Sequence, residues 1–369
     1  MIKTINLIKI ISFSFLLFFL LDATIGKYLY KKFIKKQTID VPTSFGEKDK
    51  IYDHKFVKNY NSLVGWGNLR YKLCTDESGF RISCNQKKIK SKKFDIGFIG
   101  DSFTEGTGLE YEQTFVGLIS KQLNDKKIIN LGMTSYSPSI YFAKINQLIK
   151  EGYKFGEIIL FMDISDLVDD TLCYKLVDQV VVRRDTYRSC YNNINLEKNK
   201  FSKFIKKNFK FTTLLSEVFI EKLSIIKKSN NDSTFRNVIN RSRAEWTYNY
   251  KKKNFNNLEL DEAFLISKTN MNKLSKLLKE NSIDLSIAVY PWPGTLKYDV
   301  VENQQVVLWK NFCINKCKNF YNFMPYFFNR IDKKKFYESY LDYYIDGDIH
   351  FNSFGNKIIA DEFLKQFNN

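Results

Sequence analysis

Segments with the pattern of buried strands alternate with segments of amphipathic helical pattern from Phe94 onward, and this alternation limits the fold more than any other feature. FDIGFIG, KIINLG and GEIILFMDI read as strands, and QTFVGLISKQL and SPSIYFAKINQLIKEG between them read as helices. A further helix, LDEAFLISKTNMNKLSKLLKENS, leads into the strand DLSIAVY, and SFGNKIIADEFLKQF closes the chain as a helix. This order predicts βαβ units, and therefore an α/β fold with a parallel sheet and helices on both faces.

We expect two segments to precede the α/β domain and one insertion to interrupt it. We expect residues 1–37 to form a signal anchor with a basic flank, residues 38–93 an extension packed on the main domain, and residues 94–369 the domain itself. After the third predicted strand, at about residues 171–260, lies an insertion that a minimal α/β domain does not need. We expect this insertion to form a cap beside the functional site, because long insertions often carry function.

An almost unbroken apolar run extends from Ile10 to Leu21 and is typical of an export signal or a signal anchor. The run is short for a transmembrane helix, yet no clean small-residue cleavage site follows it. We favour an uncleaved transmembrane signal anchor over a cleaved signal peptide. The lysines that follow the run outnumber those before it and favour the opposite orientation by the positive-inside rule, although a Lys-rich chain weakens that rule.

The formal net charge of +18 comes mostly from lysines that are scattered through nearly every segment. A nucleic-acid-binding protein concentrates its basic residues in a patch or stripe within a recognisable module. We therefore expect no nucleic-acid partner. The charge favours attraction to an anionic membrane surface or to a polyanionic substrate.

The six cysteines fall in three close sequence pairs: Cys74 with Cys84, Cys173 with Cys190, and Cys313 with Cys317. This arrangement is compatible with three local disulfides in an oxidising compartment, and buried free thiols are the alternative for each pair. The chain has only two histidines, His54 and His350, and the spacing supports no zinc site. We expect no metal and no cofactor, and a location in the periplasm or outside the cell.

Polar residues follow the predicted strands at their carboxyl ends, where parallel sheets bind ligands. Ser102 follows the first strand, Gly132 the second and Ser165 the third. Ser102 would lie at a strand-to-helix turn, where backbone N–H groups of the helix N-terminus can stabilise an oxyanion. A serine hydroxyl needs a base, and the base needs an orienting acid. His350 lies in YIDGDIHFN, with Asp346 and Asp348 just upstream, so the two ends of the domain together predict a hydrolase.

GDSFTEG, followed by NLG, DISD and DGDIHFN, resembles the SGNH (GDSL-type) hydrolase superfamily, in particular its membrane-anchored or exported branches that act on acylated glycans. The resemblance extends from Gly65 to the C-terminus and includes TDESGFR and VYPWPG. It implies a three-layer, flavodoxin-like sheet. It also implies that Ser102 is the nucleophile and an oxyanion donor, that Gly132 is a second donor, and that His350 is the general base.

Two positions depart from the family pattern. The family's third oxyanion donor is an Asn, and Ser165 stands in its place; loss of one such donor can cost about 2–4 kcal/mol of transition-state stabilisation. The usual Asp-x-x-His spacing would place the acid at Gly347. We favour Asp348, whose Asp-x-His spacing is seen in glycan-acetylating relatives, over Asp346.

Four residues are candidates for substrate contacts, each with a structural alternative. Trp66, Trp246 and Trp292 are candidate sugar platforms or core residues, and Trp292 is the best placed because YPWPG leaves a strand end. His54 is a candidate substrate contact or an ordinary loop residue.

These observations lead to three hypotheses for function. The first is a membrane-anchored serine esterase that removes acyl groups, most simply acetyl, from a cell-envelope or extracellular glycan. The second is an O-acyltransferase that uses the same acyl-enzyme and needs a separate membrane acyl-donor protein. The third is a non-catalytic glycan-binding or assembly subunit, in which Ser102, His350 and Asp348 would not converge.

Overall fold

The computed structural model describes residues 2–26, 28, 45–86, 91–184, 208–210, 212, 232–249, 251, 254–255 and 258–367. The chain forms two compact units. The first comprises residues 1–40 and 191–233, and the second comprises residues 41–190 and 234–369.

The first unit begins with helix α1 (Ile2–Leu21) and the π-helical turn η1 (Asp22–Gly26). The Asp22 carboxylate accepts hydrogen bonds from the Thr212 backbone N–H at 2.7 Å and from the Thr212 hydroxyl at 2.6 Å. The Phe19 ring packs edge-on against the Phe209 ring. These contacts connect the end of α1 to the segment around residue 210.

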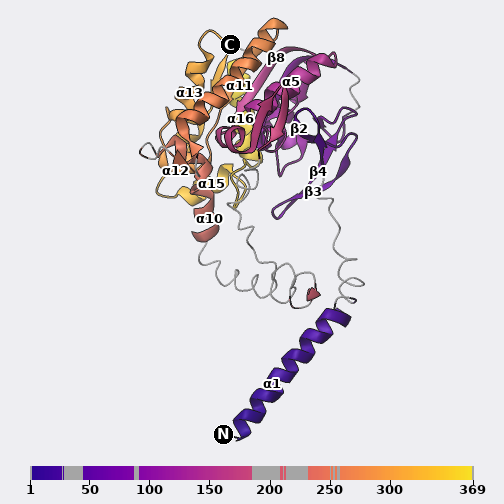
Figure 1. The fold of residues 1–369 in the computed structure, drawn as a ribbon. Coiled ribbons are helices and arrows are strands. Elements are labelled where there is room, and N and C mark those ends of the chain that lie inside the picture. Colours follow the sequence, from indigo (N-terminus) through magenta and orange to yellow (C-terminus); the bar gives the residue numbers. More distant parts are fainter. Residues whose placement is uncertain are drawn as a thin grey trace. The chain divides into compact units, whose positions relative to one another are not determined.

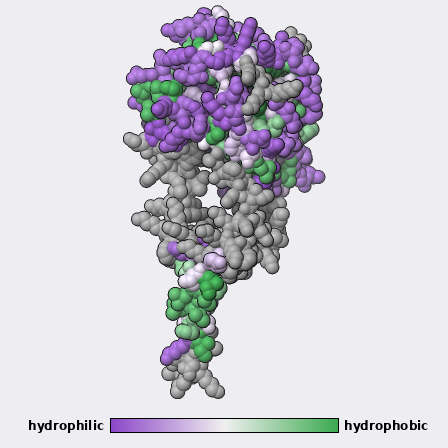
Figure 2. Space-filling model, turned by 90° about the vertical axis from the view of Figure 1, so that its right-hand side faces the viewer, coloured by the Kyte–Doolittle hydropathy of each residue, from purple (hydrophilic) through white to green (hydrophobic). Residues whose placement is uncertain are grey.

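Exposed apolar side chains lie along α1, where Figure 2 shows a band of hydrophobic surface. Of the helices within the described residues, none combines the length and the apolar character that a membrane crossing requires. The predicted transmembrane anchor is therefore not supported.

Five parallel strands form the centre of the second unit, and the alternating sequence pattern predicts four of them. They are β6 (Lys93–Gly100), β7 (Ile128–Asn130), β8 (Lys154–Met162), β13 (Asp284–Val289) and β14 (Phe320–Asn322). They lie side by side in the order β14-β13-β8-β6-β7. This is the flavodoxin-like 2-1-3-4-5 order. It brings the carboxyl ends of β6 and β8, the two central strands, next to each other.

The extension before residue 93 does more than pack on this domain, because it enlarges the same sheet. Strands β3 (Asn61–Trp66), β4 (Leu69–Thr75) and β5 (Arg81–Ile82) run antiparallel, and β5 pairs with β7 to complete an eight-stranded mixed sheet. Strands β1 (Gly46–Asp49) and β2 (Asp53–Phe56) form a separate hairpin.

Helices cover both faces of the parallel strands. Right-handed crossovers from β6 to β7 and from β7 to β8 run in opposite directions, which places their helices α4 (Phe115–Gln122) and α5 (Pro138–Lys150) on opposite faces. The helix α16 (Ser353–Phe367) packs beside α4, and α11 (Leu260–Glu280) packs beside α5 (Figure 1). The helix α13 (Gln304–Cys313) packs on β13. The predicted three-layer α/β arrangement is thus present.

Shorter elements connect these layers: α3 (Ser102–Glu105), η3 (Tyr111–Gln113), α6 (Asp166–Val168), η4 (Asp169–Cys173), α12 (Pro293–Tyr298), α14 (Met324–Phe328) and α15 (Phe336–Tyr343). The insertion contributes β9 (Tyr174–Val177), β10 (Val180–Arg183), α10 (Asp232–Ile239), η6 (Ser242–Thr247), β11 (Asn254–Phe255) and β12 (Leu258–Glu259). Most of the predicted cap, residues 185–207 and 213–231, lies outside the described residues. The cap therefore stays a prediction.

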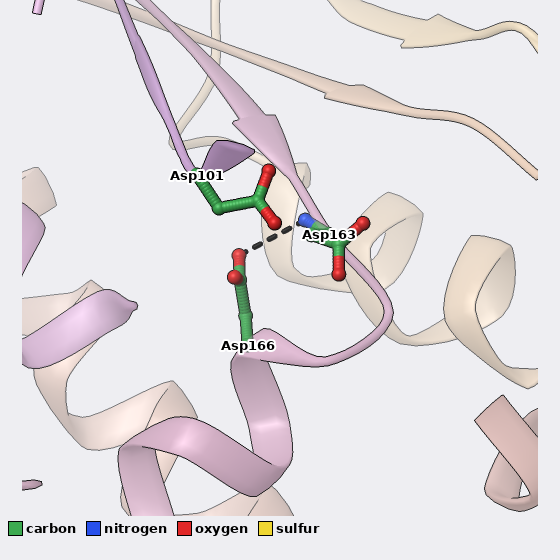
Figure 3. Close-up of side chains that lie close together, drawn as sticks. All are labelled: Asp101, Asp163 and Asp166. Carbon is green, nitrogen blue, oxygen red and sulfur yellow. Dashed lines mark hydrogen bonds between the residues drawn. The ribbon is translucent and has the colours of Figure 1, made fainter. Parts of the chain in front are cut away.

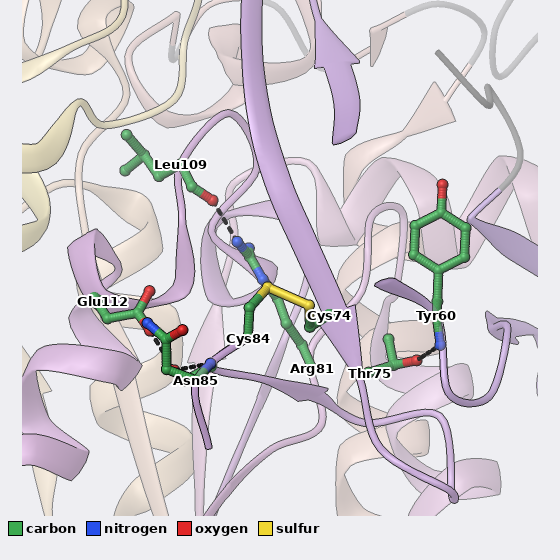
Figure 4. Close-up of a disulfide and its surroundings, with 9 residues drawn as sticks. Tyr60, Cys74, Thr75, Arg81, Cys84, Asn85, Leu109 and Glu112 are labelled. Atoms are coloured by element: carbon green, nitrogen blue, oxygen red, sulfur yellow. Dashed lines mark hydrogen bonds between the residues drawn. A yellow bond between two sulfur atoms is a disulfide. The ribbon is translucent and has the colours of Figure 1, made fainter. Parts of the chain in front are cut away.

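Two of the three predicted cysteine pairs form disulfides. Cys74 is bonded to Cys84, next to the buried Arg81 (Figure 4), and Cys313 is bonded to Cys317. Cys173 also forms a disulfide, but its predicted partner Cys190 lies outside the described residues.

The exposed face of the second unit in Figure 2 is mostly hydrophilic. This agrees with lysines that are spread over solvated surfaces.

Candidate active site

The turn that carries Ser102 is tightly built. Strand β6 ends at Gly100, and the Asp101 carboxylate caps α3 by accepting a hydrogen bond from the Phe103 N–H at 3.0 Å. A Cβ atom at Gly100 would lie 2.8 Å from the Phe161 carbonyl oxygen of β8, so the neighbouring strand leaves room only for glycine. The Ser102 side chain is therefore held at the carboxyl end of the central strands.

Ser102, His350 and Asp348 converge, although 248 residues separate the serine from the histidine. The Ser102 Oγ lies 2.7 Å from the His350 Nε2, and the His350 Nδ1 lies 2.5 Å from the Asp348 Oδ1. An ionised carboxylate can only accept, so Nδ1 carries the ring proton and Nε2 is free to accept from the serine hydroxyl. This is the arrangement of a nucleophile, a base and an orienting acid.

The structure brings Asp348, and not Asp346, to the histidine. The Asp346 carboxylate instead accepts a hydrogen bond from the Tyr337 hydroxyl at 3.0 Å. Gly347 between the two has a φ of 74°, a left-handed conformation that favours glycine. The turn at Gly347 therefore points the two carboxylates toward different partners.

The Asp348 carboxylate is held in its ionised form. Burial alone would raise its pKa, but hydrogen bonds from the His350 ring and backbone and from the Trp66 indole outweigh burial and hold the pKa well below its usual range. The Trp66 Nε1–H donates to the Asp348 Oδ2 at 2.9 Å. Sequence reasoning missed this role because no local signal connects residues that lie 282 positions apart.

Two of the three predicted oxyanion donors are engaged within the protein. The Gly132 N–H donates to the Asn130 Oδ1 at 2.9 Å, and the Ser165 N–H and hydroxyl both donate to the Asp163 Oδ1 at 2.7 Å. The Ser102 N–H, at the start of α3, has no hydrogen-bond acceptor within the part of the chain that the structure describes. It is therefore the donor best prepared to bind an oxyanion, and the roles of Gly132 and Ser165 stay predictions.

Three buried carboxyl groups lie close together: those of Asp101, Asp163 and Asp166 (Figure 3). Asp101 links this cluster to the nucleophile, because its Oδ2 lies 3.2 Å from the Ser102 hydroxyl as a second acceptor beside His350. Burial and the neighbouring acids raise the pKa values of Asp101 and Asp166 well above the usual range. Asp163 accepts two hydrogen bonds from Ser165, one from the Tyr290 hydroxyl at 3.0 Å and one from the Trp292 indole at 2.7 Å.

Those four donors use the acceptor positions of the Asp163 carboxylate. A cation would have to displace them, so the donor set around Asp163 does not fit a metal ion. Protons on Asp101 and Asp166 neutralise the cluster more simply. We interpret the three acids as a hydrogen-bonded cluster that stabilises the turn of Ser102.

The other candidate substrate residues are engaged in packing. Trp292 and Trp246 are 3% and 1% exposed, and the Trp246 indole N–H donates to the Ile164 carbonyl oxygen at 3.0 Å. Neither ring offers an exposed face for a sugar. The His54 ring bonds to the Asp53 carboxylate through Nδ1 at 2.7 Å and to the Thr134 carbonyl oxygen through Nε2 at 2.8 Å. Both nitrogens of His54 are thus occupied by the protein.

A buried arginine of the extension clamps the helix of the serine. The Arg81 guanidinium donates to the backbone carbonyl oxygens of Glu105 and Leu109, and its bond to Leu109 is drawn in Figure 4. Glu105 is the last residue of α3. Strand β5 therefore fixes the end of the helix whose first residue is Ser102.

A surface cavity of about 580 Å³ lies where the extension meets the loop before Asp348. Its lining includes Leu69 and Arg70 of the extension and Ile345 and Asp346 of the loop. Its volume is in the range of small-molecule sites.

No protein-family model matches the chain, and no curated protein is significantly similar to it. Similar solved structures include the psychrotrophic esterase EstA from Pseudoalteromonas sp., at 11% identity over 76% of this chain and 100% of that chain, with a TM-score of 0.38. A GDSL-like lipase from Bacteroides thetaiotaomicron matches at 11% identity over 77% and 91% of the two chains, with a TM-score of 0.35.

An acetylxylan esterase from Geobacillus stearothermophilus, a catalytic mutant of Axe2, matches at 10% identity over 74% and 93% of the two chains, with a TM-score of 0.36. These proteins include GDSL-type enzymes, the superfamily that the sequence motifs resemble. All three TM-scores lie below 0.5.

Proposed function

We propose that this protein is a serine esterase of the SGNH type that removes acetyl groups from a cell-envelope or extracellular glycan. One observation carries the proposal: a continuous hydrogen-bonded path from the Ser102 Oγ through the His350 ring to the Asp348 carboxylate. A non-catalytic binding subunit would not need these three side chains to converge. We propose that the glycan lies in the cavity between the extension and the loop before Asp348, which has the polar residues Arg70 and Asp346 in its lining.

In the first step, the Ser102 Oγ attacks the ester carbonyl carbon and its proton passes to the His350 Nε2. The negative charge that develops on the carbonyl oxygen lies beside the start of α3, where the Ser102 N–H is available. The ionised Asp348 stabilises the imidazolium that forms. The tetrahedral intermediate then collapses, the bond to the sugar oxygen breaks, and that oxygen takes the proton from His350.

In the second step, water attacks the acyl-enzyme. His350 accepts a proton from the water, and the new tetrahedral intermediate expels the Ser102 oxygen, which recovers its proton from His350. Acetate leaves, and the site returns to its starting state. If a sugar hydroxyl replaces water in this step, the same site transfers the acyl group.

We place this activity in an oxidising compartment, either the periplasm or the cell exterior. The support is the presence of the Cys74–Cys84 and Cys313–Cys317 disulfides, since disulfides are rare in reducing cytosol.

The test is hydrolysis of p-nitrophenyl acetate by the purified full chain, with Ser102→Ala as the matched variant. We expect the substitution to lower kcat by about a thousandfold or more. A serine-directed phosphonate should add its mass to the wild type and not to the variant. Equal turnover by both proteins, or no turnover and no labelling of the wild type, would refute the proposal.

Acetylated xylo-oligosaccharide or peptidoglycan fragments then replace the chromogenic ester, and mass spectrometry follows the loss of acetyl. A second reaction that contains an unacetylated acceptor distinguishes the outcomes. An acceptor that gains acetyl indicates transfer to a sugar, and free acetate alone indicates hydrolysis.

A further inference from the structure

The hairpin β3–β4 reaches the active site at its tip. Trp66 is the last residue of β3 and pairs with Leu69, and Gly67 between them has a φ of 54° in the left-handed region. This tight turn ends the hairpin at the position from which the Trp66 indole contacts Asp348. The contact joins the N-terminal extension to the C-terminal loop.

The two oxygens of the Asp348 carboxylate have different partners. The Oδ1 accepts from the His350 backbone N–H at 2.9 Å and from the ring Nδ1 at 2.5 Å. The Oδ2 accepts from the Trp66 Nε1 at 2.9 Å, and this is its single donor within the described residues. The indole N–H therefore decides where the second oxygen points, and with it the plane of the whole carboxylate.

Trp66 also contacts the base itself. Its ring stands edge-on to the His350 ring, with a centroid separation of 5.3 Å and an interplanar angle of 89°. Phe103 contacts the same imidazole, at 4.8 Å. These aromatic contacts restrict rotation of the ring that must keep its Nε2 directed at Ser102.

We propose that Trp66 is a positioning residue for the Ser102–His350–Asp348 triad, acting through its indole N–H on the Asp348 carboxylate. This inference rests on the proposed esterase function and assigns part of the machinery to the extension. A sugar would stack on the face of the indole ring and not on its N–H, so the role of Trp66 as a sugar platform stays a separate prediction.

The proposed role makes a specific prediction for the pH profile. An N–H donor on Oδ2 withdraws charge from the carboxylate and so weakens its hold on protonated His350. Loss of that donor leaves more charge on Oδ1, which favours the imidazolium. The acid limb of the kcat/KM profile should then move to higher pH, while the loosened acid lowers kcat.

The experiment compares Trp66→Phe, Trp66→Gln and Leu63→Ser in the full chain, with p-nitrophenyl acetate as the probe. The Phe variant keeps an aromatic ring and loses the N–H. The Gln variant restores a donor nitrogen the same number of bonds from Cβ. Leu63 lies on the same strand with its side chain 40% exposed, so it controls for changes to the hairpin.

We expect Trp66→Phe to lower kcat about tenfold or more, with little change in KM and with its acid limb at higher pH. Trp66→Gln should recover much of the loss in kcat and return the midpoint of the acid limb of the kcat/KM profile toward the wild-type value. Leu63→Ser should match the wild type in both kcat and this midpoint. Circular dichroism and a thermal melt establish that each variant is folded.

Wild-type kcat and an unmoved midpoint in Trp66→Phe would overturn the inference while leaving the esterase intact. So would equal losses in the Phe and Gln variants at an unchanged midpoint, because these indicate a packing role alone. Absence of turnover and of phosphonate labelling in the wild type is a different failure, which refutes the proposed function itself.

Discussion

The N-terminal extension and the insertion are both additions to the parallel α/β domain, yet they contact different parts of the site. The described residues of the extension are 45–86 and 91–93, and those of the insertion are 171–184, 232–249, 251, 254–255 and 258–260. The extension donates the Trp66 N–H to Asp348 and the Arg81 guanidinium to the end of α3. The insertion contacts the loop after β8, where the Trp246 N–H bonds to the Ile164 carbonyl oxygen and Arg243 pairs with Asp169 at 3.0 Å.

This difference shows that the extension does more at the described site than pack against the domain. The sequence led us to expect a cap beside the site from the insertion. From the extension it led us to expect packing, with Trp66 and His54 as candidate substrate contacts. In the structure the extension holds both the acid and the helix of the serine. The described part of the insertion contacts the segment after β8, at Ile164 and Asp169. The cap formed by the rest of the insertion, which lies outside the described residues, stays a prediction.

The largest expected effect comes from Arg81, which is 1% exposed. Arg81→Met leaves the buried carbonyl oxygens of Glu105 and Leu109 without their charged donor. We expect the free energy of unfolding to fall by about 3 kcal/mol or more, with a lower kcat because α3 is released. Urea denaturation and the esterase assay measure the two effects.

The matched control is Arg70→Met on strand β4. Arg70 is exposed, and within the described residues its side chain donates to the nearby carbonyl oxygens of Gly67 and Leu69. The free energy of unfolding of the Arg70→Met variant should differ from that of the wild type by less than about 0.5 kcal/mol. If the Arg81 and Arg70 variants are equally stable, the extension does not clamp α3.

The next effect concerns Lys144 of α5, which the extension helps to bury. Its Nζ donates to the Leu131 carbonyl oxygen at 2.9 Å and faces the rings of Tyr52, Phe80 and Tyr136. Burial lowers its pKa to about 7. Between pH 7 and 10.5 the unfolded chain therefore binds more protons than the folded chain at this site, so stability rises with pH in that window.

We predict that the wild type gains about 2 kcal/mol in its free energy of unfolding from this group between about pH 7.5 and 9.5. Lys144→Met should remove that gain, which the difference between the two proteins isolates from other titrating groups. Chemical denaturation at the two pH values provides the measurement. Parallel pH dependence in both proteins would show that Lys144 stays protonated in the fold.

The smallest expected effect comes from making the same Trp→Phe substitution in the insertion and in the extension, which compares the two regions directly. Trp246→Phe removes a buried indole donor from the insertion and should lower the free energy of unfolding by about 1 kcal/mol, with a minor change in kcat/KM. Trp66→Phe should do the reverse, losing activity with less effect on stability, since Trp66 is only half-buried. Denaturation curves and kinetics of both variants test the contrast. A larger loss of kcat in Trp246→Phe would place the insertion in the site.

Much of the fold follows from local patterns. The predicted strands of FDIGFIG, GEIILFMDI and DLSIAVY correspond to β6, β8 and β13, and the predicted terminal helix spans Ser353–Phe367 as observed. Strand β14 was missed because its three residues, Phe320–Asn322, are too few to show a period. The membership of β3–β5 in the central sheet was also missed, since strand pairing depends on residues far away in the sequence.

The sequence by itself determined the parallel α/β domain and the candidates Ser102 and His350, because hydrophobic periodicity and strand-end chemistry are local properties. Only the tertiary structure decided that Asp348 rather than Asp346 faces the histidine, through the turn at Gly347. It also decided that Trp66 bonds to Asp348 across 282 positions. These contacts depend on how distant segments pack together, and no spacing along the chain encodes that packing.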